Sequence, residues 1–186
     1  MINSILNRLK VGHLQNTPDI KADPPKFCGD IDMRITRDGT WHYRGSPIDR
    51  QAMVKLFASV LKRDEDGEFW LETPIEKCRI QVDDVPFIAV DMSVSGTGNG
   101  QIIKFRTNLD EIVIAGPDNP IRMSHEKIAK GPTPYVLVRD CLDALISRAV
   151  YYDLVEIAVK VVAANKIVLG VWSGGEFFEL GRCDEV

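Results

Sequence analysis

The sequence predicts an α+β protein built as two small lobes that face each other across a cleft. One layout occurs twice: a strand pair bearing Trp or Tyr, linked to a single amphipathic helix. The early copy carries Trp41 and Tyr43, and the late copy carries Trp172 in a hairpin near the end of the chain. A length of 186 residues is also enough for two small domains.

The chain is expected to divide into three parts. An N-terminal segment has apolar residues at helical spacing and is followed by Pro18, Pro24 and Pro25 among polar residues, which is typical of an extended connector. The predicted parts are a helical arm with its connector, 1–26, a first α+β domain, 27–94, and a second α+β domain, 95–186.

The first lobe is predicted to open with a hairpin and a helix. Apolar residues alternate with polar ones over 31–35, Asp38-Gly39 supplies a turn, and Trp41 and Tyr43 resume the alternation. Ser46, Pro47 and Asp49 then resemble a helix start with a capping box, and an apolar stripe follows to Leu61. Further strands are expected at 69–71, at Ile75, at 80–82 and at 87–94.

The second lobe is predicted to begin with strands at 102–105, 112–115 and 135–138. The stripe of apolar residues from Leu142 to Val150 predicts a helix after Arg139 that continues to Ala158. A last hairpin is expected over 167–180, with its turn at Gly174-Gly175.

Composition excludes several classes of protein. A net charge of −4 argues against generic nucleic-acid binding, because phosphate affinity depends on clustered Lys and Arg. The sequence has neither a signal-peptide run nor an apolar run long enough to span a membrane, so we expect a cytoplasmic protein. The four cysteines are scattered and predict incidental thiols, and neither a metal nor a cofactor is expected.

No residue set reaches the strength of a catalytic signature. Gly96, Gly98 and Gly100 precede a predicted strand rather than a helix, so a hairpin loop is favoured over a dinucleotide turn. We therefore assign no catalytic residue. If the protein is an enzyme, Asp30, Asp32 or His42 would supply the acid or base.

Arginine and aromatic residues near the two predicted helices suggest a ligand site. Guanidinium groups suit carboxylate or phosphate, and aromatic faces stack on flat rings. The alternative is that the aromatic residues are core and the arginines pair with nearby carboxylates. The candidate ligand-binding residues are Trp41, Tyr43, Arg50, Arg139, Arg148 and Tyr151.

Five ordered segments resemble the proteobacterial family called domain of unknown function 1285. They are DGTWHYRGSPIDR at 38–50, TPIE at 73–76, VDDVPF at 82–87, RAVYYDLV at 148–155 and GVWSGG at 170–175. The resemblance implies two α+β domains with repeated motifs and a cleft between them for a nucleotide-like ligand in a signalling context. It implies no catalytic residues.

The leading hypothesis is a sensory or regulatory protein that binds a small anionic ligand of the nucleotide type. One alternative is an enzyme acting on a small phosphorylated substrate. Another is an interaction module whose arm or strand edges bind a protein partner or a second copy. The sequence favours binding over catalysis.

Overall fold

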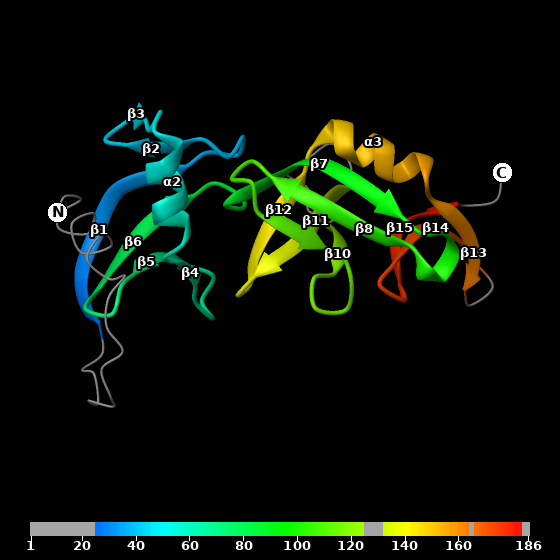
Figure 1. Ribbon diagram of the computed structural model, residues 1–186. Coiled ribbons are helices and arrows are strands. Elements are labelled where there is room, and N and C mark those ends of the chain that lie inside the picture. Colours follow the sequence, from blue (N-terminus) through cyan, green and yellow to red (C-terminus); the bar gives the residue numbers. More distant parts are fainter. Residues whose placement is uncertain (1–24, 125–131, 164–165, 184–186) are drawn as a thin grey trace, which may run out of the picture. The chain divides into compact units, whose positions relative to one another are not determined.

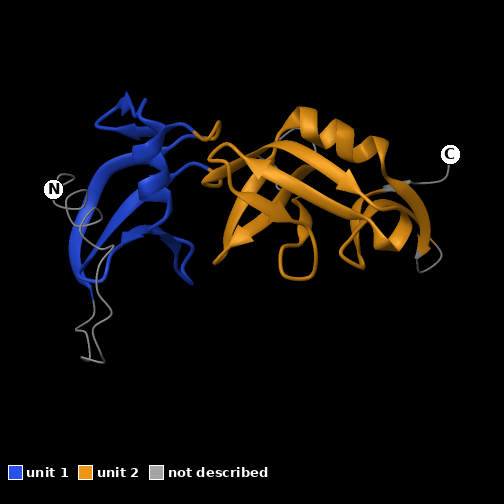
Figure 2. Ribbon diagram, in the orientation of Figure 1, with its two compact units in different colours: residues 1–36, 40–83 blue, residues 37–39, 84–186 orange. Residues whose placement is uncertain are grey.

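The computed structural model describes residues 25–124, 132–163 and 166–183, and it divides the chain into two compact units (Figures 1 and 2). The first unit comprises residues up to 83 except 37–39, and the second comprises 37–39 and 84–186. The expected arm and connector at 1–26 lie, up to residue 24, outside the described residues.

The first unit is a six-stranded sheet with one helix. Its elements are β1 (Lys26–Ile35), β2 (Trp41–Tyr43), β3 (Ser46–Pro47), α2 (Gln51–Ala58), β4 (Leu61–Arg63), β5 (Phe69–Glu72) and β6 (Glu76–Val82). The strand order is β3-β2-β1-β6-β5-β4. Only β1 and β6 pair in parallel among these strands, and every other pairing is antiparallel.

The second unit repeats this sheet and adds a smaller one. Its larger sheet contains β7 (Phe87–Ser95), β8 (Ile102–Thr107), β9 (Ile112–Ile114), β10 (Ile121–Ser124), β11 (Thr133–Arg139) and β12 (Leu142–Ile146) in the order β10-β11-β12-β7-β8-β9. The parallel pair is again formed by the first and last strands, β7 and β12, at the centre. A short 3-10 turn, η1 (Gly98–Gly100), separates β7 from β8.

The rest of the second unit is one helix and a three-stranded sheet. α3 (Arg148–Glu156) follows β12 and contacts β7. The smaller sheet is an antiparallel meander of β13 (Val159–Ala163), β14 (Lys166–Ser173) and β15 (Glu176–Cys183). Both units therefore combine sheet and helix, which agrees with the predicted α+β class, and the six-stranded sheet is repeated. The predicted order of strand pair, helix and sheet is not repeated, because α2 lies between β3 and β4 whereas α3 follows β12.

Alternation along the strands builds each core. In β1, Ile31, Met33 and Ile35 are buried while the intervening residues are exposed, so one sheet face is apolar. α2 covers this core with Val54, Phe57 and Ala58, and Phe57 stacks on buried Trp41 at 6.3 Å between ring centroids. The hairpins predicted around Asp38-Gly39 and Gly174-Gly175 are both confirmed.

The predicted start of the first helix is wrong. Ser46 and Pro47 form β3 and pair with Tyr43 and His42, so neither residue caps a helix. The chain reverses through Arg44 and Gly45, whose φ values of 51° and 76° form a two-residue hairpin turn. α2 begins at Gln51 and ends at Ala58, and Leu61 already belongs to β4.

The second predicted helix also begins too early. Residues 142–146 are strand β12, which lies between β11 and β7, and the helix starts only at Arg148. Asp140 and Cys141 both have positive φ, 44° and 62°, and join β11 to β12 as a two-residue turn. The helix ends at Glu156, and β13 follows where the sequence predicts nothing regular.

The boundary between the units falls after Asp83 rather than after Val94. β7 was expected to complete the first domain, but it pairs with β8 and β12 of the second unit. Among the described residues, no helix has the length and apolar character needed to cross a membrane.

Candidate functional site

The six predicted ligand-binding residues are divided between the two units. The first unit contains Trp41, Tyr43 and Arg50, and the second contains Arg139, Arg148 and Tyr151. Their surroundings differ sharply.

Trp41 is a core residue. It is 1% exposed and its ring stacks on Phe57. Its indole N–H has no hydrogen-bond partner among the described residues. Such burial leaves almost none of the ring surface available to a ligand.

Tyr43 and Arg50 lie at opposite ends of the segment that connects β2 to α2. Tyr43 is half-buried, and the Arg44 guanidinium lies 5.3 Å from the centre of its ring. Arg50 is exposed at the N-cap position of α2 and makes no capping hydrogen bond with its side chain. Within the described part of the chain, neither guanidinium pairs with a carboxylate.

Arg139 is already neutralised. Its Nη2 lies 3.3 Å from Oε1 of Glu111, and its guanidinium lies 5.4 Å from the centre of the Phe87 ring. The sequence anticipates carboxylate pairing as the alternative to ligand binding, although Glu111 is not among the partners that proximity in sequence suggests. Arg139 therefore has little remaining attraction for an anion.

Arg148 has a different environment on α3. Ser147 caps this helix by accepting a hydrogen bond from the Val150 amide, and Arg148 follows in the first turn. Its Nε donates to the Tyr152 hydroxyl at 2.9 Å, and its guanidinium lies 5.5 Å from the centre of that ring. Tyr152 is 53% exposed and Tyr151 is half-buried.

Carboxylate pairing divides the arginines whose side chains the structure describes. The paired group consists of Arg34, Arg37, Arg79, Arg106, Arg122 and Arg139. Arg44, Arg63 and Arg148 instead lie over aromatic rings, and Arg50 has neither kind of contact with a described residue. The guanidinium groups without a carboxylate partner retain a full positive charge toward a ligand.

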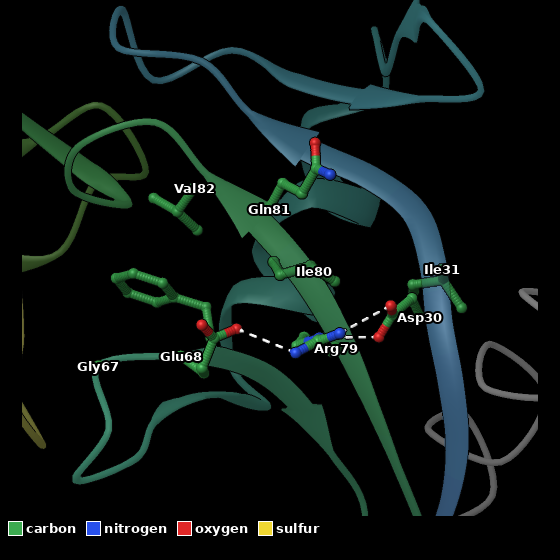
Figure 3. Close-up of a pocket in the computed structure, with 9 residues that line it drawn as sticks. Asp30, Ile31, Gly67, Glu68, Arg79, Ile80, Gln81 and Val82 are labelled. Atoms are coloured by element: carbon green, nitrogen blue, oxygen red, sulfur yellow. Dashed lines mark hydrogen bonds and ion pairs between the residues drawn. The ribbon is translucent and has the colours of Figure 1, made fainter.

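A pocket of about 330 Å³ lies on the first unit, between β1, β5 and β6 (Figure 3). Arg79 projects from β6 between two acids, with Nε and Nη2 bonded to Asp30 at 2.8 Å and Nη1 3.5 Å from Glu68. The hydrogen bond from Arg79 lowers the pKa of Asp30 below its ordinary value of 3.8. The carboxylates of Asp30 and Glu68 outweigh the single guanidinium, so this pocket does not attract an anion.

Among the residues that line this pocket, Asp30 is the candidate acid or base that the sequence suggests. Its pairing with Arg79 keeps it ionised, which is unfavourable for a general acid near neutral pH. Sequence reasoning missed Arg79 and Glu68. Because they are 11 positions apart and meet only through the β5–β6 pairing, no local pattern signals their proximity.

Neither unit presents a recognisable metal centre in its described residues. No group of three or more His, Cys, Asp and Glu side chains there could hold a metal ion. The fold and these surface features define a two-unit α+β protein whose polar chemistry lies in arginines, aromatic rings and cross-strand ion pairs.

This chain belongs to the DUF1285 family. The model of the N-terminal domain of that family, a domain of unknown function, matches residues 18–85, and the model of the C-terminal domain matches 86–180. The resemblance seen in the sequence is thereby confirmed. The two models meet between residues 85 and 86, close to the division between the compact units.

Two crystal structures of bacterial DUF1285 proteins are similar to the chain. The protein from Silicibacter pomeroyi DSS-3 is 43% identical, with a TM-score of 0.81 over 96% of this chain and 94% of that one. The protein from Shewanella baltica OS155 is 26% identical, with a TM-score of 0.53 over 68% of this chain and 91% of that one. No curated protein matches the sequence.

Proposed function

We propose that this protein binds a small anionic ligand that carries a flat ring, and that Arg148 provides the principal anion contact. The observation that carries the proposal is that Arg148 pairs with Tyr152, a neutral phenol, and with no carboxylate in the described part of the chain. Six other arginines of the described chain pair with acids, so Arg148 belongs to a minority.

The chemistry of the guanidinium supports an anionic ligand. Arginine has five N–H donors in a planar fork, and Nε of Arg148 uses one to hold Tyr152. Its two Nη groups have no partner among the described residues, so they can donate in parallel to two oxygens of one phosphate or carboxylate. The hydrogen bond at Nε fixes the orientation of the fork and reduces the entropy lost on binding.

The proposal that the ligand carries a flat ring rests on the aromatic side chains of the same helix, α3. Tyr152 is 53% exposed, and Tyr151 is half-buried beside it in the chain. An exposed aromatic face next to a cation suits a planar group attached to an anion, as in a nucleotide. Arg50 and Tyr43 offer the same two chemical groups in the first unit.

A regulatory role for such binding is part of the proposal. The cleft that the sequence predicts between the two lobes remains a prediction, and the proposed contacts within each unit stand without it. The cytoplasmic location expected from the sequence also remains a prediction, and nucleotides are available there as ligands.

A thermal-shift screen tests the proposal. Purified protein is heated with adenosine, guanosine, cytidine and uridine monophosphates, with the corresponding nucleosides, and with inorganic phosphate. A ligand at about 100 times its Kd adds roughly 2.7 kcal/mol of stability, so a bound nucleotide raises the melting temperature by several degrees. Nucleotides should raise the melting temperature more than either the nucleosides or inorganic phosphate, because both the ring and the anion contribute to binding.

Arg106→Ala is the matched control for Arg148→Ala. Arg106 is also a partly exposed arginine of the second unit, but it pairs with Asp91 at 3.2 Å and with Asp110 at 3.6 Å. The nucleotide shift should be much smaller in Arg148→Ala than in the wild type, and it should persist unchanged in Arg106→Ala. Equal shifts in both variants would remove Arg148 from the site, and no shift in the wild type would remove the nucleotide class.

A further inference from the structure

A β-bulge brings two cysteines together that are 50 positions apart in the sequence. Phe27 is the partner of Lys77, and Asp30 is the partner of Arg79, so β1 uses three steps where β6 uses two. The extra residue is accommodated around Gly29, whose φ of 86° is readily adopted only by glycine. As a result, Cys28 faces the same side of the sheet as Cys78.

Side-chain contacts on both faces of the sheet agree with this placement of Cys28. Phe27 points to the outer face, where its ring meets Trp70 edge-on at 5.8 Å. Cys78 is 1% exposed on the inner face. Half-buried Cys28 lies on the neighbouring strand, and both cysteines directly follow the paired residues Phe27 and Lys77. The Cys28 Sγ also donates to the Lys26 carbonyl oxygen at 3.6 Å.

We infer that Cys28 and Cys78 form a reversible intramolecular disulfide when a hydroperoxide oxidises the protein. The sulfur of Cys28 attacks one oxygen of hydrogen peroxide, the O–O bond breaks, and a sulfenic acid and one water result. The sulfur of Cys78 then attacks the sulfenic sulfur, and its proton leaves with the displaced hydroxide as a second water. Two thiols are oxidised and one peroxide is reduced.

The order of attack follows from exposure. Cys28 is reachable from solvent, whereas Cys78 is buried. The Cys78 sulfur is therefore expected to react with the sulfenic acid formed on Cys28 rather than with peroxide from solution. Burial, followed by the adjacent Cys28, raises the pKa of Cys78 to about 11, so its thiol stays protonated and unreactive toward peroxide in solution. Cys28 is therefore the oxidised residue and Cys78 the resolving one.

The strand pairing suits the bond. Neighbouring strands lie about 4.8 Å apart, and disulfides span Cα distances of roughly 4.4–6.8 Å. Gly29 gives β1 the backbone freedom to adjust. The new bond would lie next to the paired residues Asp30 and Arg79, which line the pocket of the first unit. Oxidation would therefore make this side of the pocket more rigid.

Thiol counting tests the inference on the full-length wild-type protein. Reduced protein, unfolded and alkylated with N-ethylmaleimide, should show all four cysteines modified, and protein treated with hydrogen peroxide while folded should show only two. Trypsin should then release peptide 27–34 joined to peptide 78–79. A dithiol reductant should restore all four sites.

Substitutions identify the pair. Cys28→Ser and Cys78→Ser should each abolish the linked peptide, and Cys141→Ser, which alters an exposed thiol in the second unit, should leave it unchanged. Four alkylated cysteines after peroxide treatment would overturn the inference. A linked peptide containing Cys141 or Cys183, or a bond between two molecules, would overturn it equally.

Discussion

Arg139 and Arg148 look equivalent in the sequence, yet the structure gives them opposite surroundings. Glu111 neutralises Arg139, while Arg148 contacts Tyr152 and pairs with no carboxylate among the residues that the structure describes. Residue type and helix proximity can be read from the sequence. The carboxylate partner cannot be, because Glu111 reaches Arg139 across 28 positions. The candidate site could therefore be predicted only as a list, without its ionic state.

Trp41 illustrates the same limit for aromatic residues. We predict that Trp41→Ala lowers the free energy of unfolding by about 3–5 kcal/mol, because it removes a buried ring and its stacking on Phe57. Trp41→Phe should cost less than about 1.5 kcal/mol, since the lost indole N–H has no partner among the described residues. Urea unfolding of the three proteins measures both values. A negligible cost for Trp41→Ala would contradict its place in the core.

Tyr135 gives a prediction for alkaline pH. Burial, followed by the charge of Asp84 and its hydrogen bond to the hydroxyl, raises the pKa of Tyr135 from 10.0 to about 12. The folded protein holds this proton more tightly than the unfolded chain, so the contribution to stability is complete below pH 10 and is lost as pH rises toward about 12. Phenolate absorbance should show one of the four tyrosines titrating late, and Tyr135→Phe should remove that step. A late step that survives the substitution would assign it elsewhere.

At the scale of elements, two turns explain both misplaced helix starts. Arg44-Gly45 and Asp140-Cys141 adopt positive φ, and each folds the chain directly into a further strand. Asp-Cys is not a recognisable hairpin signal, unlike Asn-Gly or Asp-Gly. An apolar run such as 142–146 fits a buried strand as well as a helix face. The hairpins at Asp38-Gly39 and Gly174-Gly175, with ordinary turn residues, were predictable.

The effect of removing a capping serine distinguishes the helix start seen at Ser147 from the helix start predicted at Ser46. Ser147→Ala should destabilise the protein by about 0.5–2 kcal/mol, because Ser147 caps α3 through the Val150 amide. Ser46→Ala should change the free energy of unfolding by no more than about 0.5 kcal/mol, since Ser46 is an exposed residue of β3 and caps no described helix. Chemical denaturation compares the two. A larger loss for Ser46→Ala would favour the helix start predicted from the sequence.

The β14–β15 pair contains a glycine that has no room for a side chain. A Cβ at Gly170 would come closer than 3.0 Å to the Phe178 carbonyl oxygen and the Phe177 ring, whereas one at Gly181 would meet nothing within 4 Å. Gly170→Ala should therefore cost about 1–3 kcal/mol, and Gly181→Ala should cost much less. Melting temperatures of the two variants provide the check. Equal temperatures would show that the sheet relaxes around the added methyl group.

On the scale of the whole molecule, the repeat lies in the sheets more than in the helices. Each unit joins two three-stranded meanders so that the first and last strands pair in parallel at the centre. α2 comes between the two meanders of the first unit, whereas α3 follows the second meander of the other. The sequence could predict two α+β units, because alternation and turns are local signals. It could not predict the parallel pairs or the boundary after Asp83, which depend on contacts between distant strands.

Calorimetric titration of one nucleoside monophosphate into the wild type, Arg148→Ala and Arg106→Ala most directly tests anion binding by Arg148, which pairs with no carboxylate of the described residues. A hydrogen bond to a charged group contributes about 1.5–3 kcal/mol, so Arg148→Ala should bind about 10- to 100-fold more weakly than the wild type. Arg106→Ala should retain the wild-type Kd. Indistinguishable dissociation constants for the wild type and Arg148→Ala would contradict the account.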